Sequence, residues 1–193
     1  MGNILVLDGQ QRNVLSCVRS LAKEGHSVVV GAHKRGAFCF SSRYTSRRWL
    51  YPDPSEQPSA FLDALLEEIK TTKYDLVLPF IDASTRIIVD AQTTIRQYAP
   101  IHVPSREAFQ MAFDKARTCQ IAQALNIPMP VTCYPESLHD AVEHAKNLGY
   151  PLVIKPRQSS GSRGLKIVNN EQELEHHFPS IHSNYPEPLL QEY

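Results

Sequence analysis

The sequence has no excess of charge of either sign, because its 193 residues include 20 Lys+Arg and 20 Asp+Glu. This balance argues against a nucleic-acid-binding protein, in which basic residues would outnumber acidic ones and gather together. No stretch approaches the ~18 consecutive apolar residues of a membrane helix, and the N-terminus lacks the basic region and cleavage site of a secretory signal. We therefore expect a cytoplasmic protein that binds neither nucleic acid nor membrane.

The sequence also lacks a recognisable metal or disulfide pattern. Its cysteines are widely separated and form no C-x-x-C pair. In a chain of this size without a signal peptide, this predicts reduced thiols. His139 and His144 are five residues apart and miss the i, i+4 spacing of a helical metal pair. We therefore predict no metal site among these residues. The cysteines are Cys17, Cys39, Cys119 and Cys133.

A dinucleotide-binding fingerprint is missing as well. Residues 8–13, DGQQRN, follow the first apolar run and contain a single glycine. The pattern G-x-G-x-x-G needs three, because the pyrophosphate must approach the backbone closely. This argues against an NAD-dependent oxidoreductase.

The first hundred residues alternate short apolar runs with amphipathic segments. The runs predict buried strands over residues 3–8, 27–31, 74–79 and 101–103, and the segments predict helices over 14–22, 61–69 and 87–95. Such alternation is typical of a parallel sheet covered on both faces, which binds ligands beyond the carboxyl ends of its strands. Four polar residues there are candidate substrate ligands, although turn formation and helix capping also explain them: Asp8, Gln11, Arg12 and Asp82.

From about Ser105 the pattern becomes less regular. One long helix is predicted over residues 108–122, a second over 138–148 with Gly149 at its end, and strands over 152–154, 165–168 and 188–193. The polar segment 171–177 separates the last two strands. We therefore predict an α/β domain over residues 1–106 and a small α+β domain over residues 107–193.

The segment GYPLVIKPRQSSGSRGLKIV, residues 149–168, joins two of these strands by a long loop of Ser, Gly and Arg. Backbone N–H groups in a glycine-rich turn can form an anion-binding concavity, and Arg157 and Arg163 add positive charge. Lys155 ends an apolar strand, where an ammonium group needs a partner or must reach solvent. The loop is thus either an anion site or an exposed hairpin tip.

Four segments in order resemble the ATP-grasp superfamily, especially its carbamoyl-phosphate-synthetase-like and biotin-carboxylase-like members. They are Asp114-Lys115, residues 127–130, residues 149–156 with the loop, and residues 190–193. The first hundred residues are similar to the domain that precedes ATP-grasp in these proteins. The resemblance implies a Rossmann-like parallel-sheet pre-ATP-grasp domain followed by a small α+β ATP-grasp lid subdomain.

The same resemblance implies that ATP is the cofactor. Lys115 and Lys155 would contact its phosphates, the loop would fold over them, and the last strand would bind adenine. No catalytic side chain is implied, because the chemistry depends on positioning and electrostatic stabilisation. The remaining implied ATP ligands are Arg157, Ser159, Ser160, Gly161, Ser162 and Gly164 in the loop, with Gln191, Glu192 and Tyr193 in the strand.

The implied reaction is ligation. A small-molecule carboxylate is activated as an acyl phosphate and then attacked by an amine or a thiol. Family members carry their Mg²⁺ ligands in a further subdomain beyond the last strand. We therefore expect these 193 residues to be part of a longer protein, to bind nucleotide weakly and to be inactive alone. A homodimer is one candidate assembly.

The alternative is a non-catalytic ATP-sensing or protein-interaction module. Its partner surface would be a basic and aromatic run near the middle of the first domain. An edge strand or a solvated loop also explains this run. Its residues are Arg43, Tyr44, Arg47, Arg48 and Trp49.

Overall fold

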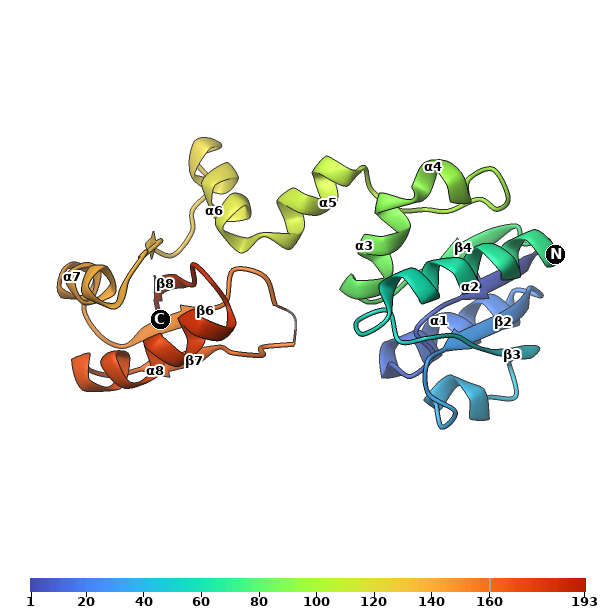
Figure 1. Ribbon diagram of the computed structural model, residues 1–193, viewed down its shortest axis with the longest axis horizontal. Coiled ribbons are helices and arrows are strands. Elements are labelled where there is room, and N and C mark those ends of the chain that lie inside the picture. Colours follow the sequence, from blue (N-terminus) through green and yellow to red (C-terminus); the bar gives the residue numbers. More distant parts are fainter. Residues whose placement is uncertain (160) are drawn as a thin grey trace. The chain divides into compact units, whose positions relative to one another are not determined.

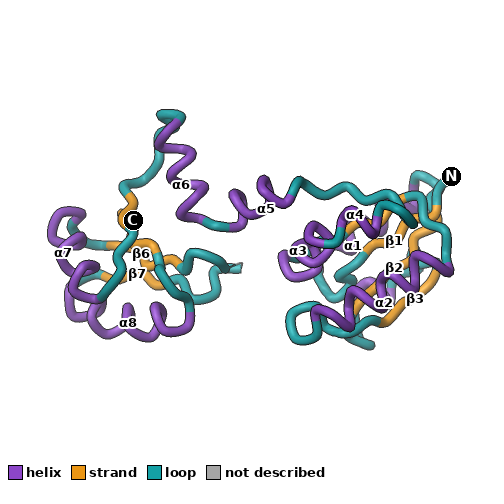
Figure 2. The backbone as a smooth tube through the Cα atoms, turned by 45° about the horizontal axis from the view of Figure 1, so that its top comes forward, coloured by secondary structure: helices purple, strands orange, loops and turns teal. Residues whose placement is uncertain are grey.

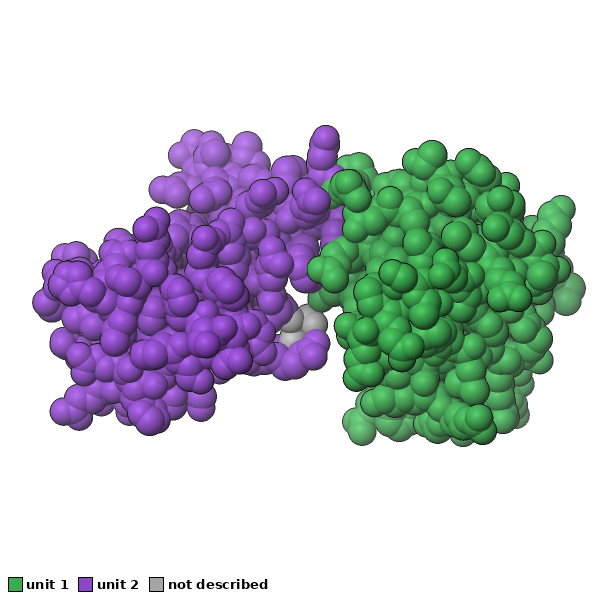
Figure 3. All heavy atoms as spheres, viewed as in Figure 1, with its two compact units in different colours: residues 1–106 green, residues 107–193 purple. Residues whose placement is uncertain are grey.

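The computed structural model describes residues 1–159 and 161–193. It divides into two compact units, Met1–Arg106 and Glu107–Tyr193, which Figure 3 shows in different colours. Ser160, one of the predicted lid residues, lies outside the described residues. Within the described residues, no helix has the length and apolar character needed to cross a membrane.

The first unit is built on a four-stranded parallel sheet in the order β3-β2-β1-β4 (Figure 1). Its strands are β1 (Asn3–Val6), β2 (Ser27–Ala32), β3 (Arg47–Leu50) and β4 (Leu76–Leu78). The predicted α/β class is confirmed, but the expected strand at residues 101–103 is only a single bridge between Ile101 and Val77. The edge-strand interpretation of Arg47, Arg48 and Trp49 is also confirmed, because β3 pairs only with β2 among the described residues.

Helices cover both faces of this sheet. Alternate residues of β1 enter two separate cores: Leu5 packs with Phe61 of α2 (Pro58–Thr71), and Val6 packs with Val14 of α1 (Arg12–Lys23). This two-residue alternation explains why β1, β2 and β4 are mostly apolar on both faces, unlike the edge strand β3. The helix predicted over residues 87–95 is in fact two, α3 (Asp82–Asp90) and α4 (Gln92–Ile95), and a short 3₁₀ helix, η1, spans Phe38–Ser41.

The second unit contains a four-stranded antiparallel sheet in the order β5-β8-β6-β7. The strands are β5 (Thr132–Cys133), β6 (Leu152–Lys155), β7 (Lys166–Val168) and β8 (Leu189–Glu192). The helices α7 (Leu138–Leu148) and α8 (Glu171–Asn184) pack against one face, and Figure 2 shows them beside β6 and β7. Their shared core includes Ala141, Leu152, Ile154, Leu174 and Phe178. The predicted α+β arrangement is confirmed.

One sequence prediction in this unit was wrong, and one helix was not predicted. The long helix over residues 108–122 is two helices, α5 (Arg106–Phe113) and α6 (Lys115–Ala124), because Asp114 is extended and caps the second. The polar segment 171–177 is the first half of α8, whose buried residues Leu174, Phe178 and Ile181 follow helical spacing.

Candidate functional site

Successive side chains of β6 point to opposite faces of the sheet, and the two faces differ in character. Leu152 and Ile154 point into the core beneath α7 and α8, so Lys155 belongs to the opposite face. Gln191 of β8 pairs with Val153 in the antiparallel register, which places its side chain on this same face. The face that α7 and α8 leave uncovered therefore carries the polar groups.

Lys155 is half-buried and is held through Gln191. Its Nζ donates to Gln191 Oε1, and Gln191 Nε2 donates in turn to Thr132 Oγ1 of β5 at 2.6 Å. Gln191 is itself buried, so its amide has few other positions available. The chain of contacts fixes the ammonium group across three neighbouring strands.

Lys115 reaches the loop that Lys155 begins. Its main-chain N–H donates to the carbonyl of Arg157 at 3.1 Å, and its Nζ donates to the carbonyl of Ser159 at 2.7 Å. Lys115 is the first residue of α6 rather than a mid-helix residue, and the start of that helix is therefore joined to the loop. The structure thus brings both predicted phosphate lysines to residues 155–159.

Asp114 organises this junction. Its Oδ1 accepts from the main-chain N–H of Ala116 at 3.0 Å and caps α6, while Arg157 Nε donates to both carboxylate oxygens at 2.7 and 2.8 Å. Burial opposes ionisation of Asp114, but the hydrogen bonds from Arg157, Arg117 and Ala116 outweigh it and lower the pKa. Asp114 is therefore a buried carboxylate that stays charged and holds Arg157.

The guanidinium of Arg157 is held on its other side as well, because its Nη1 donates to Glu187. A cavity of about 610 Å³ adjoins these groups. Neither Lys115 nor Lys155 lines it, so the cavity is a neighbour of the two lysines and does not enclose them. Its lining residues include Asp114, Arg117, Arg157, Tyr185 and Glu187.

The glycine-containing loop has left-handed backbone at three described positions, with φ of 64° at Gly161, 58° at Ser162 and 75° at Gly164. A Cβ at Gly164 would lie 2.6 Å from Tyr185 Cε2 and 2.7 Å from Pro156 Cγ. Gly164 therefore permits a close approach that no other residue could make without displacing its neighbours. Gly161 and Ser162 are exposed at the loop tip.

The end of β8 leaves Glu192 and Tyr193 exposed. The main-chain N–H of Glu192 donates to the carbonyl of Val131 at 3.1 Å, which fixes the strand beside β5. Both residues are thus accessible, and their contact with adenine stays a prediction.

The candidate substrate residues of the first unit separate into two groups. Asp8 is fully buried and accepts hydrogen bonds from Ser84 Oγ at 2.6 Å, the Phe80 N–H at 2.8 Å and Tyr51 Oη at 2.9 Å. It therefore ties β1 to the residues after β4, as turn and capping chemistry would. Gln11, Arg12 and Asp82 are exposed, and their substrate role stays a prediction.

Sequence reasoning missed Asp114, Thr132 and Glu187 as site residues. Asp114 had a signal, because Asp before a helix is a favoured cap, but the surrounding apolar repeat suggested an unbroken helix. Thr132 lies in a two-residue strand, and Glu187 has a φ of 53° in a turn. Neither has a pattern that points to Gln191 or Arg157.

A metal centre does not fit the described residues, since no group of three or more His, Cys, Asp or Glu side chains gathers among them. We therefore derive no chemical step through a metal ion held by this part of the chain.

Three similarities connect the sequence with known proteins. Residues 114–185 match the family described as carbamoyl-phosphate synthase L chain, ATP binding domain. A stretch of 67 residues, 35% of this chain, is 43% identical to D-alanine--D-alanine ligase from Pseudomonas entomophila (strain L48), of which it covers 21%. Another of 87 residues, 45% of this chain, is 32% identical to the carbamoyl phosphate synthase large chain of Archaeoglobus fulgidus, of which it covers 8%.

The fold of the whole chain is similar to that of a biotin carboxylase from Campylobacter jejuni, solved as a complex with beta-gamma-ATP. The TM-score is 0.76 at 18% sequence identity, over 99% of this chain and 45% of that one. The chain therefore spans less than half the length of each protein named here.

Proposed function

Because the chain belongs to the ATP-grasp superfamily and has the fold of the N-terminal part of its members, we propose that it forms the nucleotide-holding part of an ATP-dependent ligase. The observation that carries this proposal is that Lys115 Nζ contacts the carbonyl of Ser159, in the loop that directly follows Lys155. Lys115 begins α6 and Lys155 ends β6, where its Nζ contacts Gln191 of the neighbouring strand β8. Two ammonium groups held in this way suit a polyphosphate.

In the proposed site, one group of residues binds the phosphates of the nucleotide and another binds its adenine. Lys115 and Lys155 bind the phosphates with Arg157 and the N–H groups of the loop, where positive charge and backbone donors coincide. Glu192 and Tyr193 form the edge that binds adenine, with the glutamate accepting from the exocyclic amine. The loop residues Ser159, Gly161, Ser162 and Gly164 close over the phosphates, and we assign Ser160 the same role from its position in the sequence.

The proposed reaction activates a small-molecule carboxylate. A carboxylate oxygen attacks the terminal phosphorus of ATP, ADP leaves, and the acyl phosphate that results is attacked by an amine or thiol with release of phosphate. The protein's part is positioning and charge stabilisation. Mg²⁺ accompanies ATP in this proposal, and the first unit supplies the substrate contacts Gln11, Arg12 and Asp82. We expect the 193 residues alone to bind nucleotide without turnover.

The first test compares nucleotide binding by the 193-residue chain with that of Lys155→Ala, using calorimetric titration with ATP and AMP. Loss of one charged hydrogen bond to phosphate is worth about 1.5–3 kcal/mol, so we expect ATP to bind roughly 10- to 100-fold more weakly. AMP binding should change much less, because AMP lacks the outer phosphates. Lys115→Ala should show the same selectivity.

Lys146→Ala is the matched control. Lys146 is an exposed residue of α7 whose Nζ contacts Glu143 at 2.6 Å, so its removal changes net charge equally without touching the site. Circular dichroism establishes that all three variants fold. Equal ATP affinities for the Lys155→Ala and Lys146→Ala chains would overturn the phosphate role, and loss of AMP and ATP binding to the same degree would contradict the assigned geometry.

A further inference from the structure

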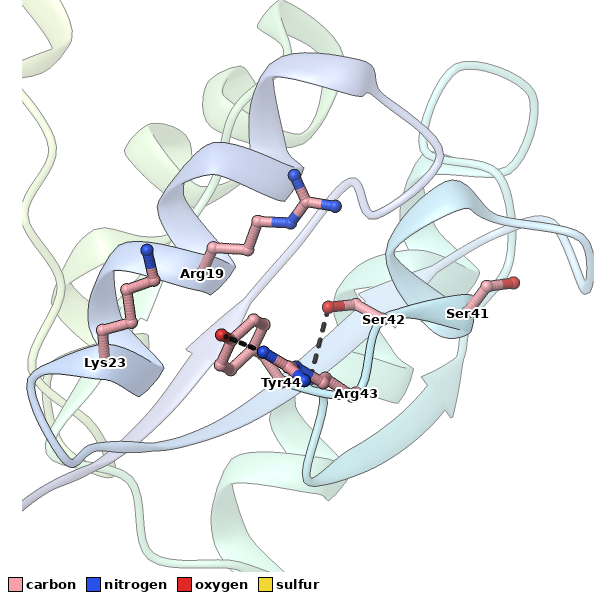
Figure 4. A pocket seen from close by; sticks show the side chains of 6 residues that line it. All are labelled: Arg19, Lys23, Ser41, Ser42, Arg43 and Tyr44. Atoms are coloured by element: carbon pink, nitrogen blue, oxygen red, sulfur yellow. Dashed lines mark hydrogen bonds between the residues drawn. The ribbon is translucent and has the colours of Figure 1, made fainter.

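A second cavity, of about 540 Å³, lies within the first unit and has no part in the proposed nucleotide site. Figure 4 shows two side chains from the last two turns of α1 and four residues from the end of η1 and the turn that follows it. The lining residues are Arg19, Lys23, Ser41, Ser42, Arg43 and Tyr44.

One side of this cavity, formed by Lys23 and Tyr44, lies toward the amino end of the sheet, because the chain continues from Tyr44 to Ser46, whose N–H donates to the carbonyl of Val28, the second residue of β2, at 2.9 Å. Its other side, at Ser41, belongs to η1, in which the Cys39 N–H donates to the carbonyl of Gly9 at 3.0 Å. Lys23 is the last residue of α1, which leads back to the start of β2. None of the predicted substrate residues, which follow the carboxyl ends of the strands, lines this cavity.

The lining carries three cations and no carboxylate. Among the described residues, no ion pair joins Arg19, Lys23 or Arg43 to an acidic side chain within 4.0 Å. The chain as a whole has equal numbers of acidic and basic residues, so this is a local excess. Three like charges around one cavity repel each other, and an anion would relieve that repulsion.

The turn that carries Arg43 is held in place by buried residues and hydrogen bonds. Cys39 and Phe40 of η1 are buried, and Thr45 Oγ1 donates to the Cys39 carbonyl at 2.6 Å. Arg43 Nη2 donates to Tyr44 Oη at 3.0 Å while its guanidinium lies 5.0 Å from the Tyr44 ring centroid. The turn that presents Arg43 is therefore anchored beneath and beside the cavity, which reduces the ordering that a ligand would have to impose.

The pKa of the Tyr44 phenol is affected by the same three cations. Its pKa is lowered, first by the hydrogen bond and charge of Arg43 and then by the charges of Lys23 and Arg19. Arg43 has the largest effect, and the smaller effects of Lys23 and Arg19 place these two cations near the same phenol. The negative end of the α1 dipole would account for a cation at Lys23 but not for Arg43 on the separate turn.

We propose that this cavity binds a phosphate group, either free or as a small phosphomonoester. Guanidinium groups match the oxygens of phosphate in pairs, and the Ser41 and Ser42 hydroxyls supply further donors. The volume lies within the ~300–1,000 Å³ of typical small-ligand pockets. Because none of the residues predicted to bind the substrate or the nucleotide lines it, the site would serve an effector or an anchoring group rather than the reacting carboxylate.

The test uses the 193-residue chain labelled with ¹⁵N and titrated with inorganic phosphate, glycerol 3-phosphate and glycerol. We expect saturable amide shifts at Ser42, Arg43 and Tyr44 with both phosphates and none with uncharged glycerol. Tighter binding of glycerol 3-phosphate would identify an ester as the ligand, and equal binding would identify free phosphate, both in support of the site.

The double variant Arg19→Gln/Lys23→Gln should weaken phosphate binding at least tenfold. The control is Lys34→Gln/Arg35→Gln, which removes two exposed cations of the same unit that lie outside the cavity. An equal loss in the control would show a general attraction of anions and overturn the proposal, as would a titration without saturable shifts at residues 42–44. Retention of these shifts in Lys155→Ala would show that the site is independent of the nucleotide site.

Discussion

At the scale of single residues, Asp114 shows how one short side chain sets the geometry of a site. By capping α6 it makes Lys115 a first-turn residue, and by accepting from Arg157 it joins that turn to the loop after β6. Asp is among the residues favoured at this capping position, and the longer Glu is not. The position of Lys115 therefore depends on the residue before it.

The charge of Asp114 gives a testable pH dependence. Its pKa is lowered in the folded protein, so its contribution to stability is present above its ordinary value of 3.8 and is lost as pH falls through the lowered pKa. Asp114→Asn keeps a good capping residue but removes the charge that holds Arg157. We expect the variant to be about 1–3 kcal/mol less stable at pH 7, with the difference vanishing in acid.

Thermal unfolding of both proteins at a series of pH values measures this difference. Other carboxylates whose pKa is lowered, such as Glu143 and Glu173, titrate in both proteins and cancel from the comparison. A stability difference that stayed constant from neutral to acid pH would show that packing, rather than the charge of Asp114, is responsible.

The individual site residues were predictable to different degrees. Lys155 was recognisable because a lysine that ends an apolar strand needs a partner, and the structure provides Gln191. Lys115 could be identified only from the resemblance, since a lysine in an apparently continuous helix is usually a surface residue. Its contact with Ser159 depends on the break at Asp114, and that break was hidden by apolar residues at helical spacing on both sides.

At the scale of elements, α8 shows why a helix can be missed. Its first half is polar, and Pro179 lies within it, a residue that usually ends a helix. The buried residues Leu174, Phe178 and Ile181 nevertheless follow a helical period. The start signal is a capping arrangement, because Asn170 Oδ1 accepts from the Glu173 N–H at 2.9 Å while Glu173 accepts from the Asn169 N–H.

Asn170→Ala should therefore destabilise the second unit by about 1 kcal/mol, the usual cost of losing a helix cap. Asn170→Gly should cost only a few tenths, because glycine is itself a tolerated cap, and this variant serves as the control. Urea unfolding followed by far-ultraviolet circular dichroism measures both values. If alanine and glycine destabilised the protein equally, the side-chain cap would not be what begins α8.

The strands also differ in whether the sequence alone could predict them. β1, β2 and β6 were predicted from their apolar runs, because burial leaves such strands few polar positions. β5 has two residues and no pattern of its own, and it forms only through its pairing with Gln191 and Leu190. Strand order is also a tertiary property: β8 is last in the chain yet lies between β5 and β6.

At the scale of the whole molecule, each unit contains its own apolar core. Leu5 and Phe61 belong to one core of the first unit, and Leu152 and Phe178 belong to the core of the second. The chain has one tryptophan, Trp49, which packs against Tyr51 with ring centroids 5.1 Å apart in the first unit. Tryptophan fluorescence therefore reports on the first unit alone, whereas circular dichroism reports on both.

We expect the two cores to respond separately to mutation. Phe178 is almost fully buried, and Phe178→Ala should cost the second unit about 3–5 kcal/mol through lost contacts and the cavity that remains. The urea midpoint measured by Trp49 fluorescence should stay where it is, while part of the circular dichroism change moves to lower urea. Phe61→Ala is the matched variant in the first unit and should shift the fluorescence midpoint instead. If Phe178→Ala moved the Trp49 midpoint as far as Phe61→Ala does, the units would unfold as one cooperative body, and stability in one would depend on the core of the other.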